Sequence, residues 1–211
     1  MKEKVIQFAD KQGRSVVGTL LIPDGDGQSP AVIVCHGFKG SRDQTHLKII
    51  SEALTKKGLV SLRIDFTKEP GESSLPFQEM TISYELEVLD QTVNFLKNLP
   101  EVDPAKIGLT GHSLGGLVVA WYAANHPEIA AVAPLSGVYN FFIMWRERYG
   151  EELTQEMIKE GFAYVYSESL RKELKIDVSF YEDAINYDMD KVIQNLVCPL
   201  LIVQGTADES V

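Results

Sequence analysis

Residues 106–120 read KIGLTGHSLGGLVVA, which is the most informative stretch of the chain. The apolar run at 107–110 predicts a buried strand, and the Ala-rich apolar run that ends the stretch predicts a helix. Between them lies the pattern G-x-S-x-G, in the strand–turn–helix context where it is informative. So sharp a turn gives its serine strained backbone angles, and Gly111 and Gly115 remove side chains that would collide. We therefore expect Ser113 to be a nucleophile at the carboxyl end of the sheet, above a helix N-terminus that favours negative charge.

The composition is that of one globular domain. The chain has 211 residues, of which 45% are hydrophobic and 24% charged. A formal net charge of −10 argues against nucleic acid or an anionic membrane as a partner. No apolar run has the length of a membrane span, and the N-terminus has no signal-peptide core, so the default expectation is a cytoplasmic location. Cys35 and Cys198 lie at the edges of apolar runs without metal-binding spacing. We expect buried, reduced thiols and neither a metal nor a cofactor.

Short apolar runs alternate with helical patterns along most of the chain. Two antiparallel strands are predicted at residues 5–8 and 15–22. Buried strands are predicted at residues 31–35, 59–64, 107–110, 129–135 and 200–203. Helical spacing marks residues 47–57 and 82–96. Continuous apolar strands that alternate with helices predict an α/β fold, with a mostly parallel sheet and helices on both faces.

This rhythm breaks after Val138. Residues 139–187 contain 11 of the 19 aromatic residues of the chain, mixed with many charges. They predict short amphipathic helices inserted between two strands as a small lid. The alternative is a plain helical crossover, but the segment is too long for one. The expected organisation is a core at 1–138, the lid at 139–187 and a continuation of the core at 188–211.

A serine nucleophile needs a base, a group that orients the base, and donors for the oxyanion. The loop after the strand at 31–35 begins His36-Gly37-Phe38, and its backbone N–H groups can point toward the serine. We expect the N–H groups of Phe38 and Leu114 to form the oxyanion hole. His36 lies at a strand end, far before the nucleophile in sequence, which favours a structural role beneath the loop over that of the base.

Together these motifs resemble the α/β-hydrolase superfamily, and within it the small bacterial feruloyl and cinnamoyl serine esterases, which are related to prolyl-oligopeptidase-like hydrolases. The resemblance covers nearly the whole chain and is weakest in the lid. It is carried by HGFKG at 36–40, SLRIDF at 61–66, the turn at Ser113 and VQGTAD at 203–208. It implies that Asp208 is the acid of the catalytic triad, although a carboxylate that only caps its loop remains an alternative.

Two departures from the family pattern stand out. The loop at 67–73 reads TKEPGES where the family has Arg-Gly-x-Gly-x-Ser, so one wall of the pocket is expected to differ. The family also places the triad histidine a few tens of residues beyond the acid, and this chain ends three residues after Asp208. We therefore expect an α/β-hydrolase fold without its last strand and helix, and a fragment that is impaired as an enzyme.

The four histidines are His36, His46, His112 and His126. His112 occupies the variable position of the serine turn and is expected to point away from the site. His46 and His126 lie on or just after predicted helices and are expected at the surface. None of the four is assigned as the base.

The resemblance implies a carboxylic ester hydrolase that works through an acyl-enzyme on Ser113. The aromatic lid favours small to aromatic, cinnamoyl-like esters. The alternatives are a serine peptidase or amidase of the prolyl-oligopeptidase-like type, and a truncated, non-catalytic α/β-hydrolase scaffold. The expected partner is a small-molecule ester, with no nucleic acid and no membrane. A homo-oligomer is left open, because a missing strand would expose an apolar sheet edge.

Overall fold

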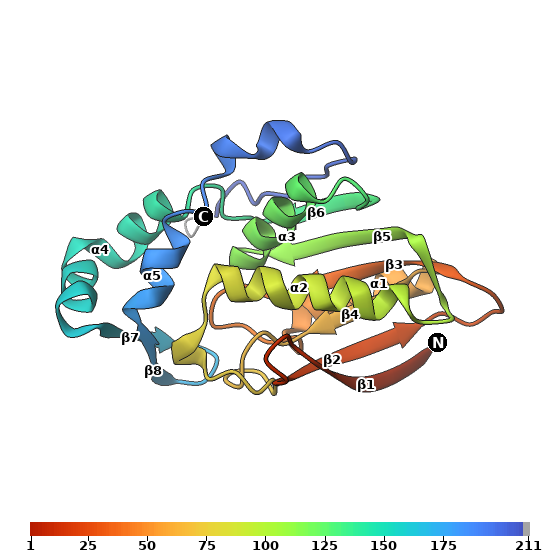
Figure 1. Cartoon of the computed structure of the whole chain (residues 1–211), viewed down its shortest axis with the longest axis horizontal. Coiled ribbons are helices and arrows are strands. Elements are labelled where there is room, and N and C mark those ends of the chain that lie inside the picture. The colour runs from red at the N-terminus through yellow and green to blue at the C-terminus, as the bar shows by residue number, and fades with distance from the viewer. Residues whose placement is uncertain (209–211) are drawn as a thin grey trace.

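The computed structural model describes residues 1–208, and within them a six-stranded sheet has the order β1-β2-β4-β3-β5-β6 (Figure 1). The strands are β1 (Lys2–Ala9), β2 (Ser15–Ile22), β3 (Ser29–Cys35), β4 (Val60–Ile64), β5 (Val102–His112) and β6 (Ala131–Leu135). β2 runs antiparallel to both β1 and β4, whereas β4, β3, β5 and β6 are parallel to one another. The predicted antiparallel pair and mostly parallel sheet are confirmed.

Helices cover both faces of this sheet. They are α1 (Thr45–Lys56), α2 (Ile82–Lys97) and α3 (Leu114–Asn125). Figure 1 shows α2 and α3 side by side on the near face, with α1 on the far face. α2 begins where the Thr81 hydroxyl accepts a hydrogen bond from the Tyr84 N–H at 3.0 Å. None of the helices within residues 1–208 combines the length and the apolar character that crossing a bilayer requires.

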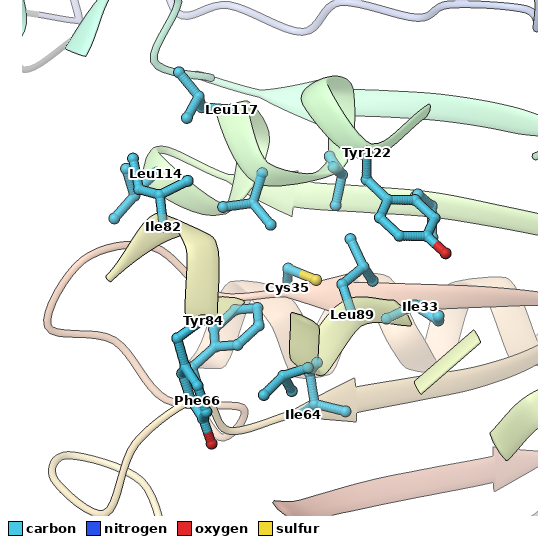
Figure 2. Packing of buried hydrophobic residues seen from close by; sticks show 14 of the residues in the cluster. Ile33, Cys35, Ile64, Phe66, Ile82, Tyr84, Leu89, Leu114, Leu117 and Tyr122 are labelled. Carbon is cyan, nitrogen blue, oxygen red and sulfur yellow. The ribbon is translucent and has the colours of Figure 1, made fainter. Parts of the chain in front are cut away.

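The core fills the space between the sheet and the pair α2–α3. Figure 2 shows Ile82 and Leu89 of α2, Leu114 of α3 and Cys35 of β3 among the side chains of this layer, and all four are buried. Burial raises the pKa of the Cys35 thiol, which therefore stays protonated. Cys198 is only partly buried and lies outside any strand. The expectation of buried strand cysteines is thus confirmed for Cys35 and wrong for Cys198.

The inserted segment, residues 139–187, is called the lid below. It contains α4 (Phe141–Glu160), the antiparallel hairpin β7 (Phe162–Ser167) and β8 (Lys172–Asp177), and α5 (Val178–Ala184). Figure 1 shows it beyond the carboxyl ends of the parallel strands. Helices alone were expected here, and that expectation is wrong for the hairpin. The residues of β7 alternate, with Ala163 and Val165 buried and Tyr164 and Tyr166 exposed, which is the two-residue period of a strand.

After the lid the chain makes short 3-10 turns at Met189–Lys191 and Ile193–Asn195 and then returns to the sheet. Residues 200–203 run parallel to β6 through isolated bridges at Leu200 and Val203. The predicted burial of this segment is wrong, because Leu201 and Ile202 are 61% and 64% exposed. β6 covers one edge of the segment, and no described strand covers the other. The last part of the predicted core segment, residues 209–211, lies outside the described residues.

A buried ion pair ties the loop after β3 to the loop after β4. The Arg42 guanidinium pairs with Asp65, and the Arg42 backbone N–H donates to Asp65 Oδ1 at 2.7 Å. Asp65 is fully buried and Arg42 is 5% exposed. The rebuilt loop at 67–73 adds Glu72, whose carboxylate lies 2.5 Å from Arg42 Nη2 and whose side chain is 68% exposed. The loop that departs from the family pattern is thus held by this same arginine.

Glu85 on α2 is also buried, but no ion pair within residues 1–208 includes it. The residue is fully buried, and neither carboxylate oxygen has a hydrogen-bond partner in the described part of the chain. Burial, with a smaller effect from Asp183, raises the pKa of Glu85 well above its usual range. The folded protein therefore holds this carboxyl in its neutral form.

The substitution Glu85→Gln tests that protonation state. Between the pKa of Glu85 in the unfolded chain, about 4.3, and its raised pKa in the fold, the folded state binds more protons, so stability falls as the pH rises. At about pH 4 the variant should match the parent chain. At about pH 8 it should be more stable by at least about 1 kcal/mol. Urea unfolding at both pH values measures this, and a difference that does not change with pH would contradict it.

The substitution Asp65→Ala tests the ion pair. It leaves the Arg42 guanidinium buried without its main partner, which should lower the free energy of unfolding by about 3 kcal/mol. Glu72→Gln removes the exposed partner of the same arginine and should cost less than about 1 kcal/mol. Urea unfolding of both variants at neutral pH provides the comparison. Equal, small losses would show that the buried pair does not hold the two loops together.

Candidate active site

The turn between β5 and α3 has the strained geometry that the sequence predicts. Ser113 has φ 54° and ψ −119°, in a region that residues with side chains rarely adopt. The turn is held by hydrogen bonds on both sides. The Ser113 N–H donates to Leu135 O at 3.0 Å, and Ser113 O accepts from the Gly116 N–H at 2.8 Å and the Val138 N–H at 3.1 Å. Neighbouring strand, helix and lid entry thus fix this one residue.

Gly111 and Gly115 are required by close backbone contacts around Ser113. A Cβ atom on Gly111 would collide with the backbone of Gly115, and a Cβ atom on Gly115 would collide with the carbonyl group of His36. Both contacts involve backbone, which cannot move aside as a flexible side chain can. The expected role of the two glycines is confirmed.

Ser113 lines a cavity of about 240 Å³ at the carboxyl end of the parallel strands. The structure brings all the candidate site residues together in its wall, namely Ser113, Leu114, Phe38 and Asp208. The lid supplies the opposite wall with Phe141, Met144, Trp145, Arg148 and Tyr149. A second cavity, of about 680 Å³, adjoins the first and shares Met144, Arg148 and Asp208 with it.

Two backbone N–H groups in this wall have no acceptor within residues 1–208. Within residues 1–208, neither the Phe38 N–H nor the Leu114 N–H donates a hydrogen bond to another protein group. Leu114 is the first residue of α3, where backbone N–H groups lack partners inside the helix. The two N–H groups therefore remain available to an acceptor that enters the cavity.

His36 lies beneath the loop that carries Phe38. Its Nδ1–H donates to Gly37 O at 2.9 Å, and its Nε2 accepts from the Phe66 N–H at 3.1 Å. The ring is buried, and this burial lowers the pKa of His36. Both nitrogens of the neutral ring are thus occupied by backbone, as expected for a structural residue.

His112 lies in the wall of the cavity and not away from the site as expected. It lines the same cavity as Ser113 and Asp208, so the prediction that it points away from the site is wrong. Its ring lies edge-on to that of His46, with centroids 4.6 Å apart. Burial and the neighbouring His46 lower the pKa of His112, and the charge of Asp208 acts in the opposite direction. A motif position that varies within a family carried no sequence signal for this placement.

The placement of the four histidines bears on which group could act as the base. Neither His112 nor any other histidine of residues 1–208 is hydrogen-bonded to Ser113. His46 lies on α1 and is partly buried, not at the surface as expected. His126 stacks on Tyr122 at the far end of α3 from Ser113.

Asp208 reaches the cavity from the turn after residues 200–203. Its N–H donates to Gly205 O at 3.2 Å, and its carboxylate is close enough to influence the pKa of His112. Within residues 1–208 no group of three or more His, Cys, Asp or Glu residues is arranged to hold a metal ion.

Comparisons with known proteins agree with this geometry. Residues 16–157 match the model of the dienelactone hydrolase family. A putative carboxymethylenebutenolidase of Synechocystis sp. is 29% identical over 139 residues, which cover 60% of this chain and 55% of that protein. Esterase EstD of Thermotoga maritima is 27% identical in an alignment that covers 92% of this chain and 50% of that protein. The chain thus spans about half the length of the curated relatives it matches.

Solved structures extend the likeness to the fold. Est1E from Butyrivibrio proteoclasticus, solved with ferulic acid bound, superposes with a TM-score of 0.83 at 25% sequence identity. The superposition covers 98% of this chain and 80% of that one. The α/β-hydrolase GrgF from Penicillium sp. sh18 also superposes with a TM-score of 0.83, at 19% identity, over 100% of this chain and 82% of that one. With its parallel sheet, its serine turn and the match over residues 16–157, the chain belongs to the dienelactone hydrolase family and has the α/β-hydrolase fold.

Proposed function

We propose that the chain is a serine hydrolase that cleaves carboxylic esters through an acyl-enzyme on Ser113. One observation carries the proposal: a serine held in a strained turn shares a cavity with two backbone N–H groups that have no acceptor within residues 1–208. Two such donors are what an oxyanion needs. Phe38 and Leu114 are the proposed oxyanion hole.

The proposed reaction has two halves. Ser113 Oγ attacks the ester carbonyl carbon and gives its proton to an imidazole base, while the carbonyl oxygen takes up the negative charge between the N–H groups of Phe38 and Leu114. No histidine of residues 1–208 is hydrogen-bonded to Ser113 to serve as that base. The tetrahedral intermediate then expels the alcohol, which takes a proton, and leaves the acyl group on Ser113. Water repeats the sequence and releases the acid. Asp208 is the proposed acid that orients the base and stabilises its charged form.

The proposed substrates are esters with a small or aromatic acyl group. The lid wall of the cavity is built from Phe141, Trp145 and Tyr149, which provide flat apolar surface for a ring. The Thermotoga relative is named an esterase, and the Butyrivibrio structure holds ferulic acid, an aromatic acid. Both support the proposal at the level of the reaction and of the acyl group.

A non-catalytic scaffold is the second candidate. The observation that favours it is that no histidine of residues 1–208 is hydrogen-bonded to Ser113. Such a protein would keep the fold and the cavity and bind ligands without turnover.

The substitution Ser113→Ala separates the two candidates. For a hydrolase, it should lower the kcat for p-nitrophenyl acetate by about 10³-fold or more, because the acyl-enzyme can no longer form. Thermal unfolding should change little, since a small hydroxyl is removed from a cavity wall. Near-normal turnover by the variant would end the serine-hydrolase proposal. A parent chain that neither turns over p-nitrophenyl acetate nor is labelled at Ser113 by a fluorophosphonate would favour the scaffold.

The amidase alternative is tested with a matched pair of substrates. p-Nitrophenyl acetate and acetyl-p-nitroanilide carry the same acyl group and differ in the atom that leaves. An esterase should cleave the ester far faster than the anilide, and Ser113→Ala should abolish both activities. Comparable kcat/KM values for the two substrates would instead favour a peptidase or amidase.

A further inference from the structure

The lid contacts the turn at residues 37–40 through two consecutive side chains, those of Phe38 and Lys39. Residues Gly37 and Gly40 close the turn, because the Gly40 N–H donates to Gly37 O at 2.9 Å. Phe38 and Lys39 are its two central residues. Lys39 has φ 59°, a left-handed conformation that usually selects glycine at the second central position of a turn. A turn with this strain needs support from its surroundings.

Phe38 is held through its ring. The ring of Phe180, on α5, stacks on it with centroids 5.0 Å apart and planes 14° apart. Trp145, on α4, meets the Phe38 ring edge-on at 6.3 Å, and Phe77 packs against it from the core side at 5.4 Å. Phe180 is itself fully buried, so this contact has a rigid base within the lid.

Lys39 is held through its ammonium group. Lys39 Nζ donates to the carbonyl oxygen of Tyr166, on β7, at 2.7 Å. The same group lies 5.6 Å from the centre of the Phe38 ring and 5.7 Å from that of Tyr149. Burial, and after it the neighbouring Arg148, lower the pKa of Lys39, so the group is partly withdrawn from water.

We infer that the lid positions the oxyanion hole, with Phe180 and Lys39 as the positioning residues for the Phe38 N–H. The inference rests on the proposed function and adds a role for the lid beyond enclosing the substrate. The N–H of Phe38 precedes the two anchored side chains in the same turn. If the turn rotates, that N–H no longer points at the place where the oxyanion forms. The stacking by α5 and the hydrogen bond to β7 oppose that rotation from two directions.

The test uses Lys39→Met and Phe180→Leu in the 211-residue chain, with p-nitrophenyl acetate as a substrate too small to depend on the aromatic wall. Each substitution should lower kcat by about 10-fold to 100-fold, because a misplaced donor weakens binding of the transition state. KM should stay within about twofold. Lys39→Arg keeps a donor at the same place and should restore most of the kcat. The double variant should lose less than the product of the single losses, because both residues act through one N–H group.

The chain offers a matched control in Lys172. Its Nζ lies 2.7 Å from the Glu69 carboxylate and ties β8 of the same hairpin to the loop after β4, without touching the turn at 37–40. Lys172→Met removes a lysine tether of the same 2.7 Å length, here to a carboxylate instead of a backbone carbonyl, and should leave kcat unchanged. If it lowers kcat as much as Lys39→Met does, attachment of the lid in general is what matters, and the inference is overturned.

A second readout does not depend on turnover. The rate at which a fluorophosphonate labels Ser113 also requires the hole, because the phosphonyl oxygen develops negative charge there. The labelling rate should fall in Lys39→Met and Phe180→Leu and stay normal in Lys172→Met. If the parent chain is labelled and both variants keep the parent's labelling rate and kcat, the inference is overturned but the proposed function stands. Raised KM with unchanged kcat would also overturn it, by showing that the residues only line the cavity. A parent chain with neither labelling nor turnover would overturn the proposed function and the inference together.

Discussion

Ser113 holds backbone angles that an L-residue rarely adopts, and the surrounding structure is arranged to keep it there. β5 ends at the residue before it and α3 begins at the residue after it, so strand and helix meet at this one point. The Ser113 N–H is bonded to the end of β6, and its carbonyl accepts from the first turn of α3 and from the chain as it enters the lid. The glycines on either side allow the close approach of the backbone that these bonds need. The turn thus places Ser113 where β5, α3 and the cavity meet.

The part of the molecule predicted from sequence is the part encoded by local patterns. The serine turn, the buried strands other than residues 200–203, and the structural role of His36 each depend on a few adjacent residues whose spacing or type is informative. The rest depends on contacts between distant residues. Phe38 and Phe180 are far apart in the chain, and no local pattern in either segment predicts that their rings stack. The hairpin in the lid could not be predicted in this way. Tyr164 and Tyr166 lie on the exposed side of β7, whereas aromatic residues in a sequence are usually expected to be buried.

Two kinds of interaction support the loops around the cavity. On the core side, neutral or paired polar groups are buried: His36 bonds to backbone with both ring nitrogens, and Arg42 joins Asp65. On the lid side, stacked rings and a lysine hold the turn with Phe38. Buried polar groups fix geometry, because the loss of a partner is costly. The turn with Phe38 is thus held from the core by buried polar groups and from the lid by stacked rings and a lysine.

Ser113 and the N–H groups of Phe38 and Leu114 are proposed to form one reactive site. A crystal structure of the chain after reaction with a fluorophosphonate would test this arrangement. Phosphorus should be bonded to Ser113 Oγ, with a phosphonyl oxygen about 2.7–3.1 Å from both backbone nitrogens. An adduct on another residue, or an adduct on Ser113 whose oxygen points away from Phe38 and Leu114, would contradict it.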